Sequence, residues 1–377
     1  MANDEHFFQN GALPDVRPQE EKDKDYRFEE LVSAPAAVQW IEKKMADLRK
    51  FPIFNQNGSG SCVAQTLRKI LGVLYWLKYG KFVDLSATHI YQRRSNKPAG
   101  GMWGVEAFNI ARTGVTLEEF AESDLMTDAE MDGMKIVELW VKIGEAFKLT
   151  NFVILPSKNF DVAASTIQKT GKAIMMWFHF LYSEWTECPT IKDPNLPESG
   201  TNVCRHSVSG TDVTLIGQSN LPSRPDAHGK ESIFMEDSWG GATAIDGRRF
   251  ITREFYEKRN FFAAYPISFV YEDQSQPEPQ PDPQPQPNPS KPKYTFLIDL
   301  EKGQRGADIV ALQNILKYEG CFPKNIDSTG YYWSVTSDAV YKFQMKHKVA
   351  DASELNALKG NRVGAKTRAK LNELYSK

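Results

Sequence analysis

The sequence lacks any long hydrophobic run. No stretch approaches the roughly 18 uninterrupted apolar residues that a membrane-spanning helix needs. The first residues, MANDEHFFQNG, contain neither the basic leader nor the apolar core of a secretory signal. We therefore expect a soluble chain without a membrane span or an export signal, made in the cytoplasm.

Cysteine is also scarce. The 377 residues include four cysteines, Cys62, Cys188, Cys204 and Cys321, and no CxxC pair. Neither a zinc site nor a dense disulfide framework is expected. Cys188 and Cys204 bracket a loop rich in proline and asparagine, and both a disulfide and two unpaired thiols are compatible with that placement. Nothing in the sequence points to a metal or an organic cofactor.

An excess of charge of one sign is missing as well. Lys and Arg number 46 against 48 Asp and Glu, which gives a formal net charge of -2. No global field therefore draws the chain to nucleic acid or anionic lipid, and we expect no nucleic-acid partner. We expect a monomer, although the sequence carries no pattern that decides the oligomeric state.

Proline is abundant in one segment. From Gln274 to Pro292 it occupies nearly every second position, which removes backbone donors and fixes φ, so an extended spacer is predicted. We predict a polar N-terminal arm over residues 1–33, a large domain over 34–272, the linker over 273–293 and a small domain over 294–377. The mixed charges of the arm indicate a solvated segment or a short helix, not core.

Hydrophobic periodicity predicts the elements of the large domain. Apolar residues recur at spacings of three and four from Val63 to Tyr79, and Gly80 follows as a stop. This indicates a buried helix with Cys62 at its N-terminus. Runs rich in β-forming residues predict strands at Ala173–Phe180, His206–Gly217 and Ser232–Trp239. The first half of the domain is thus predicted to be helical and the second half mostly sheet.

Cys62 stands where a thiol can become a nucleophile, since the positive end of a helix dipole and a nearby imidazolium both lower a thiol pKa. The preceding loop, NQNGSGSC, permits backbone N–H groups to approach a bound carbonyl. Taken alone, however, a cysteine at a helix start is more often a small buried residue, and a single histidine in a strand is usually structural. The other histidines, His6, His89, His179, His228 and His347, are interpreted as surface or core residues.

Three motifs together resemble the papain-like cysteine peptidase family. They are Gln56-Asn57-Gly58-Ser59-Gly60-Ser61-Cys62, Arg205-His206-Ser207-Val208 and Glu236-Asp237-Ser238-Trp239-Gly240. His206 follows Cys62 by 144 residues, inside the range of about 130 to 150 typical of that family. Asp237 lies 175 residues after Cys62, and an enlarged hairpin loop from Gln218 to Lys230 would absorb the excess.

The resemblance implies an α+β, papain-like two-lobe fold with a helical lobe and a β-barrel-like lobe. It implies catalytic roles for Cys62 as nucleophile, Gln56 as oxyanion donor, His206 as base and Asp237 as the group that orients it. Gly100 and Gly101 would line the substrate cleft with Trp239, which would also shield the His206–Asp237 bond from water. The family has Asn at the position of Asp237, and the change could alter the pH range. It also has an aromatic residue where Val63 stands and a structural cysteine in place of Ser59.

The small domain has its own pattern. Ile309, Leu312 and Leu316 share one face of a predicted helix that stops at Gly320. The segment Gly330–Thr336 is echoed by Val363–Thr367, an internal pseudo-repeat of loop, threonine cap and helix. Residues 297–375 resemble the peptidoglycan-binding domain family, apart from a longer segment from Ala350 to Gly360. The resemblance implies a three-helix domain with peptidoglycan or wall peptides as partner, and a purely structural helical unit is the alternative.

The leading hypothesis is a cysteine endopeptidase that hydrolyses peptide amide bonds through a Cys62 thioester and is held on the bacterial cell wall, as an endolysin is. The missing export signal favours a phage-encoded protein that acts at the wall after release or within a virion. One alternative is a thiol protease acting on surface or virion proteins. Another is an inactive papain fold serving in wall adhesion or in a virion. No helical pro-region precedes Val38, so activation by removal of a full pro-domain is not predicted.

Overall fold

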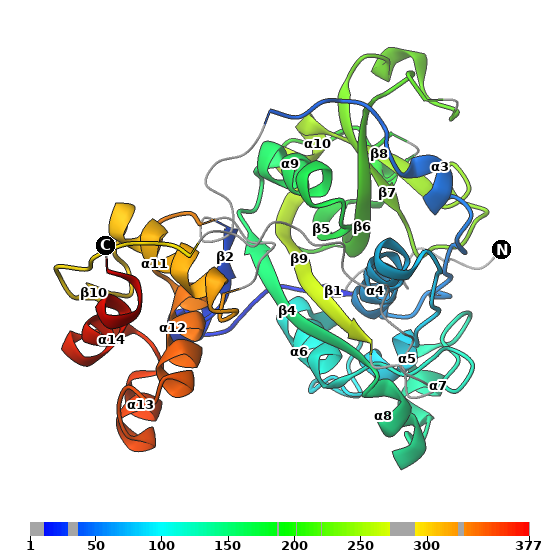
Figure 1. Cartoon of the computed structure of the whole chain (residues 1–377). Helices are drawn as coiled ribbons and strands as arrows, with labels where there is room; N and C mark the ends of the chain where they lie inside the picture. The colour runs from blue at the N-terminus through cyan, green and yellow to red at the C-terminus, as the bar shows by residue number, and fades with distance from the viewer. Residues whose placement is uncertain are drawn as a thin grey trace. The chain divides into compact units, whose positions relative to one another are not determined.

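The computed structural model describes residues 11–28, 37–186, 188–200, 202–219, 221–271, 291–322 and 328–376. The chain divides into two compact units, both drawn in Figure 1. The large unit comprises Met1–Val16 and Ala36–Ser275, and the C-terminal unit comprises Arg17–Pro35 and Gln276–Lys377. Residues 273–290 of the predicted linker lie outside the described part of the chain.

The long helix of the large unit is α4, Cys62–Tyr79. Its first three turns are buried, and Gly80 ends it with a φ of 70°, a left-handed conformation that favours glycine. The Gly80 N–H donates to the carbonyl of Trp76 at 2.8 Å. The predicted helix, its start at Cys62 and its stop are therefore confirmed. This helix packs against the middle of the sheet, along strand β6, as Figure 1 shows.

The sheet of the large unit is antiparallel, with strand order β4-β9-β5-β6-β7-β8. The strands are β4 (Phe147–Leu155), β5 (Ile174–Leu181), β6 (Val203–Leu215), β7 (Glu231–Glu236), β8 (Arg248–Thr252) and β9 (Asn260–Tyr271). The three predicted strands are confirmed as β5, β6 and β7. However, β7 ends before Asp237, so Asp237, Ser238 and Trp239 lie in the loop that follows it. The predicted loop between β6 and β7 is present and contains a short 3-10 turn, Pro225–Ala227.

Most helices of the large unit precede the sheet in the chain. They are α3 (Met45–Leu48), α5 (Ala87–Tyr91), α6 (Gly104–Thr113), α7 (Asp128–Gly133) and α8 (Glu138–Gly144), followed among the strands by α9 (Phe160–Thr170), the 3-10 turn Tyr182–Glu184 and α10 (Arg253–Arg259). One further pair of short strands is parallel, β1 (Ala12–Leu13) with β3 (Met102–Trp103). The unit thus has a helical part and a sheet part, as predicted, and the fold is α+β.

The C-terminal unit contains α11 (Ala307–Tyr318), α12 (Ser334–Lys346), α13 (Ala352–Leu358) and α14 (Ala365–Tyr375), with a two-stranded ladder of β10 (Leu300–Glu301) and β11 (Arg362–Val363). It also includes α1 (Gln19–Lys22) and β2 (Tyr26–Arg27) from the N-terminal arm. The prediction of three helices after the linker was one too few for the described residues. The additional helix, α13, occupies the longer segment Ala350–Gly360.

The predicted pseudo-repeat has a structural counterpart in two glutamine–threonine pairs. Gln313 donates from Nε2 to Thr336 Oγ1 at 2.9 Å, and Gln344 donates to Thr367 Oγ1 at 2.9 Å. In both pairs the partners are 23 residues apart. The prediction that the threonines cap their helices is wrong, because the N-cap positions are Trp333 and Gly364. Each threonine lies one turn further in, where its hydroxyl satisfies a buried glutamine amide.

No helix among the described residues is long and apolar enough to cross a membrane.

Candidate active site

Cys62 is the first residue of α4 and lies against strand β6. Its thiol is fully buried, and this burial raises the pKa of the thiol to about 12. The backbone N–H of Ser207 on β6 donates to the sulfur and opposes part of that rise, because a hydrogen bond favours the thiolate. Since Ser207 follows His206, the contact between α4 and β6 brings together the cysteine and histidine singled out from the sequence.

His206 and Asp237 form a buried hydrogen-bonded pair. His206 Nε2 donates to Asp237 Oδ1 at 2.7 Å, and both side chains are at most 1% exposed. Burial would raise the pKa of Asp237, but the charges and hydrogen bonds of His206 and Arg249 outweigh it and hold that pKa at about 2. The carboxylate is therefore ionised at neutral pH. The other ring nitrogen, Nδ1, has no hydrogen-bond partner among the described residues, so it is available to accept a proton.

Aromatic side chains surround this pair. The ring of Trp239 lies 4.7 Å from the His206 ring, centroid to centroid, and Trp185 meets the same ring edge-on at 5.9 Å. Trp185 also donates from Nε1 to Asp237 Oδ2 at 2.8 Å. The position of Trp239 fits the predicted shielding of the His206–Asp237 bond from water. Trp185 was not singled out for this purpose, because an aromatic residue close to a strand is more often part of the core.

Arg249 is the second neighbour that no motif indicated. It projects from β8 and donates from Nε to Asp237 Oδ2 at 3.2 Å, with its side chain 4% exposed. Its guanidinium lies 5.2 Å from the centre of the Trp185 ring. Asp237 therefore has a buried cationic partner in addition to His206.

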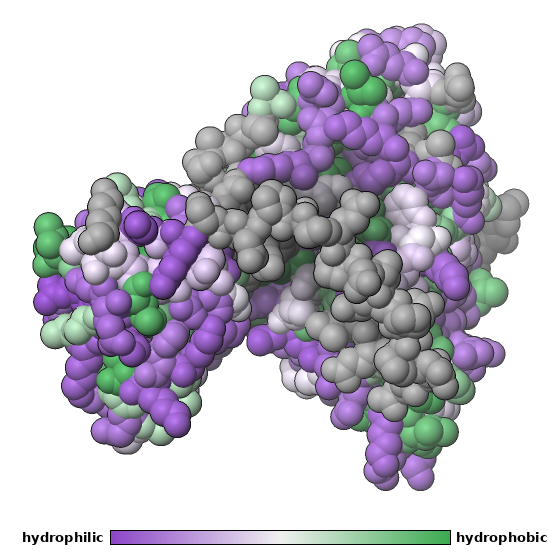
Figure 2. Space-filling view, viewed as in Figure 1, coloured by the Kyte–Doolittle hydropathy of each residue, from purple (hydrophilic) through white to green (hydrophobic). Residues whose placement is uncertain are grey.

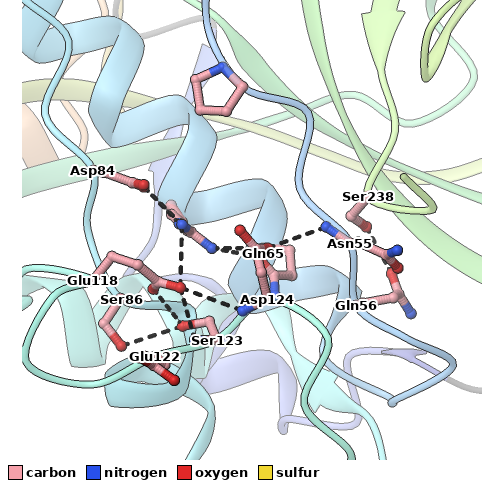
Figure 3. Close-up of polar contacts among 12 residues, drawn as sticks. Asn55, Gln56, Gln65, Asp84, Ser86, Glu118, Glu122, Ser123, Asp124 and Ser238 are labelled. Carbon is pink, nitrogen blue, oxygen red and sulfur yellow. Dashed lines mark hydrogen bonds and ion pairs between the residues drawn. The ribbon is translucent and has the colours of Figure 1, made fainter. Parts of the chain in front are cut away.

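Gln56 is fixed by the loop that carries Asp237. Its backbone N–H donates to the Ser238 carbonyl at 2.8 Å, and Ser238 Oγ donates to its Oε1 at 2.6 Å, a contact drawn in Figure 3. Gln56 Nε2 donates to the carbonyl of Ser59 at 2.6 Å. An amide nitrogen carries two hydrogens, so one donor of Gln56 remains for a ligand.

A buried cation on α4 anchors the loop that carries Gln56. Arg68, with no exposed surface on its side chain, contacts three carboxylates: Asp84 at 2.8 Å, Glu118 at 3.3 Å and Asp124 at 3.2 Å. Asp124 also accepts the backbone N–H of Asn55 at 3.1 Å. Figure 3 shows these carboxylates gathered on one side of the loop that leads to Gln56. The network holds the segment before Gln56 in place.

The predicted glycine pair lies beside the loop that precedes Cys62. A Cβ atom added to Gly60 would come within 2.4 Å of the backbone nitrogen of Gly101 and 3.2 Å of the carbonyl carbon of Gly100. The Gly101 N–H donates to the hydroxyl oxygen of Tyr91 at 2.9 Å. Gly100 and Gly101 therefore lie against Gly60, which precedes Cys62 by two residues in the sequence.

The chain covers its own thiol. The segment Gly11–Leu13, called the strap below, pairs in parallel with Met102–Trp103, and the Met102 N–H donates to the Gly11 carbonyl at 2.9 Å. A Cβ atom at Gly11 would lie 2.3 Å from Cys62 Sγ. Ala12 is fully buried, so the prediction that the whole N-terminal arm is solvated is wrong for the strap. The arm has a place in the fold because glycine permits this close approach.

The remaining cysteines take no part in this site. All four cysteines are buried and none is in a disulfide, so Cys188 and Cys204 are two separate thiols. Among the described residues, no group of three or more His, Cys, Asp or Glu side chains could hold a metal ion.

The fold is similar to that of solved cysteine proteases. Xylellain, a cysteine protease from Xylella fastidiosa, superposes with a TM-score of 0.52 at 15% sequence identity, covering 69% of this chain and 96% of that one. A digestive procathepsin L2 proteinase from the larval midgut of Tenebrio molitor gives a TM-score of 0.50 at 14% identity, covering 71% and 80%. No protein-family model matches the sequence, and no curated protein matches it. The likeness shows the fold, which is papain-like with two lobes.

Proposed function

We propose that the chain is a cysteine peptidase with Cys62 as nucleophile. The observation that carries this proposal is the buried His206–Asp237 hydrogen bond next to a cysteine at a helix N-terminus. Asp237 holds the imidazole by its Nε2–H, which leaves Nδ1 as the proton acceptor for the thiol. A papain-like fold presents these groups at the junction of its helical part and its sheet.

The chemistry follows from these positions. His206 Nδ1 takes the thiol proton, and the Cys62 thiolate attacks the scissile carbonyl to form a C–S bond and an oxyanion. The free N–H of Gln56 and the backbone N–H of Cys62 stabilise that oxyanion. When the C–N bond breaks, the imidazolium protonates the leaving amine. Water, deprotonated by His206, then hydrolyses the thioester and restores the thiol.

The described conformation is a closed one. The strap covers Cys62, and burial keeps the thiol pKa at about 12, so the thiol is protonated at neutral pH. A substrate reaches the sulfur only when the strap leaves its pairing with Met102 and Trp103. Departure of the strap also admits water, which lowers the thiol pKa because the desolvation cost falls.

We further propose that the C-terminal unit binds peptidoglycan and that the substrates are wall peptides, as in an endolysin. The motif resemblance and the pseudo-repeat support this assignment. Lys302 lies over the Trp333 ring at 4.6 Å and Arg305 over the Tyr331 ring at 3.9 Å, giving paired aromatic and cationic groups. Hydrophilic residues predominate on the face of this unit seen in Figure 2, which suits a polar polymer. Tethering a peptidase to its polymer would raise the local concentration of scissile amides.

The test uses purified peptidoglycan and casein, each incubated with the full chain, with Cys62→Ala and with Gly11→Ala, in which the strap is displaced. Mass spectrometry identifies the products. Wall peptides released in a Cys62-dependent manner support the peptidoglycan substrate, and casein cleavage alone redirects the activity to protein substrates. If neither substrate gives a Cys62-dependent product with any form, including Gly11→Ala, the peptidase proposal is wrong and an inactive papain fold remains.

A further inference from the structure

Arg249 and Asp237 form a buried ion pair on the side of the carboxylate away from His206. His206 donates to Oδ1, whereas Arg249 Nε and Trp185 Nε1 both donate to Oδ2. The Ser238 N–H donates to Oδ1 at 2.7 Å. Two donors thus contact each oxygen, so the carboxylate has one orientation. Arg249 supplies the only positive charge among the three donors other than His206.

An isolated carboxylate at this depth would be costly, and it would also hold the imidazolium strongly. A neutral amide could accept the same N–H bond without either effect. An aspartate paired with an arginine carries no net charge, so it resembles the amide electrically while keeping the acceptor geometry of a carboxylate. The pairing with Arg249 therefore explains how Asp237 can occupy a position at which the papain-like family has asparagine.

We propose that Arg249 is a positioning residue that neutralises Asp237, so that the Cys62–His206 pair exchanges its proton beside a neutral ion pair and not beside a bare anion. This inference rests on the proposed function only for its effect on turnover. Its effect on the thiol and the imidazole can be measured without any substrate.

The charges around the site support this assignment. On α4, which begins with Cys62, the charge of Lys69 is paired with Glu236 at 2.9 Å. On β8, Arg248 contacts Glu236 at 3.1 Å. From α7, Asp128 acts on Cys62 through its charge. Of the two consecutive arginines on β8, Arg248 thus pairs with Glu236 and Arg249 pairs with Asp237.

The experiment compares four variants of the full chain: Arg249→Gln, Asp237→Asn, the double variant and Arg249→Lys. The first readout is the alkylation rate of Cys62 by iodoacetamide against pH, followed by mass spectrometry of the Cys62 peptide. The second is the pH profile of kcat/KM on whichever substrate is cleaved. Circular dichroism confirms that each variant is folded, and Arg248→Gln on the same strand is the matched control.

We expect Arg249→Gln to move both limbs of the profiles upward by about one pH unit, because a bare carboxylate favours the protonated imidazole and opposes the thiolate. Asp237→Asn leaves Arg249 unbalanced and moves them downward by a similar amount. The double variant restores a neutral site, and its profile returns to within about a third of a unit of the original. Arg249→Lys retains the charge and moves the limbs least among the single variants.

The outcomes separate the two proposals. Limbs that stay in place in Arg249→Gln, or that move no further than in the Arg248→Gln control, overturn the role of Arg249 whether or not the chain cleaves peptides. Alkylation profiles that shift as expected in a chain without peptidase activity leave the role of Arg249 standing and reject the function. If Arg249→Gln does not fold, the double variant decides. A profile close to that of Arg249→Lys supports the role of Arg249, and a profile shifted down as far as that of Asp237→Asn overturns it.

Discussion

The two sides of the candidate site are assembled differently. On the proposed nucleophile side, Gln56, Gly60 and Cys62 lie within one loop and the start of α4. Backbone and amide hydrogen bonds hold them, and the buried Arg68 network anchors the segment before Gln56. On the base side, the groups come from strands or loops far apart in the chain, and buried charges hold them: Trp185, His206, Asp237 and Arg249. A local loop can be recognised in a sequence, whereas a charge network made by strand pairing cannot.

The two sides also differ in how water is excluded. The side chains of Trp185 and Trp239 pack around His206 and Asp237 and cover them. A three-residue piece of backbone from the start of the chain covers Cys62. Under the proposed function, the base side is already in its working arrangement, whereas the strap has to leave Cys62 before a substrate can bind. Substitutions on each side should therefore change different quantities.

The largest effect is expected at the nucleophile. Cys62→Ala should reduce hydrolysis by roughly a thousandfold or more, because no other group in the site can form the thioester. Release of labelled peptides by liquid chromatography measures the rate. Cys204→Ala is the matched control, since Cys204 is also a buried free thiol and lies on β6 two residues before His206. Equal losses in the two variants would show that the effect is one of folding.

The next effect concerns acid stability on the base side. The pKa of Asp237 is held at about 2, below its ordinary value, so its contribution to stability is complete above about pH 4 and disappears as the pH falls toward 2. The shift corresponds to about 2 kcal/mol. Asp237→Asn should flatten the dependence of the unfolding free energy on pH across that interval, measured by urea denaturation.

The control for the acid series is Asp246→Asn, an exposed carboxylate in the loop before β8 with a positive φ that asparagine also adopts. Its slope should match that of the original chain. An unchanged slope in Asp237→Asn would mean that the ion pairs with His206 and Arg249 do not persist in solution.

Part of this comparison could be predicted from the sequence. The three- and four-residue spacing after Cys62 predicted α4 and its stop at Gly80, and runs rich in β-forming residues predicted β5, β6 and β7. Gln56 and Cys62 share a loop with a recognisable pattern, and His206 and Asp237 stand in the expected order. The bond between those last two depends on β6 and β7 pairing in one register, which the sequence alone leaves open.

The remaining groups lacked a local signal. Gly11 lies in a polar arm, where a glycine normally marks a turn, and only its contact with Cys62 Sγ shows what it does. Arg248 and Arg249 follow each other on a strand, a pattern typical of surface charge, yet both are buried by pairing with carboxylates on β7 and after it. The helix α13 was missed because it has only seven residues, of which Leu355 alone is buried, so it lacks an apolar stripe of useful length.

The third effect is an increase. Gly11→Ala places a methyl group where only 2.3 Å separates the Cβ position from Cys62 Sγ, so the strap has to move away. We expect alkylation of Cys62 to become about tenfold faster, which corresponds to about 1.4 kcal/mol in the opening equilibrium. Mass spectrometry of the Cys62 peptide at fixed pH gives the rate. Gly133→Ala, where an added Cβ meets nothing within 4 Å, is the control, and equal rates in both variants would argue against a covering strap.

The smallest effect is expected from the hydrogen bond of Trp185. Trp185→Phe keeps an aromatic ring beside His206 but removes the Nε1–H that donates to Asp237 at 2.8 Å. Losing one donor to a buried carboxylate costs about 1 kcal/mol, so kcat should fall about fivefold while KM changes little. Trp76→Phe, on the far part of α4, controls for the loss of an indole. A fall in kcat confined to Trp185→Phe would show that the base side depends on the Trp185 donor. Equal values in the two variants would assign the orientation of Asp237 to its other three donors, His206, Ser238 and Arg249.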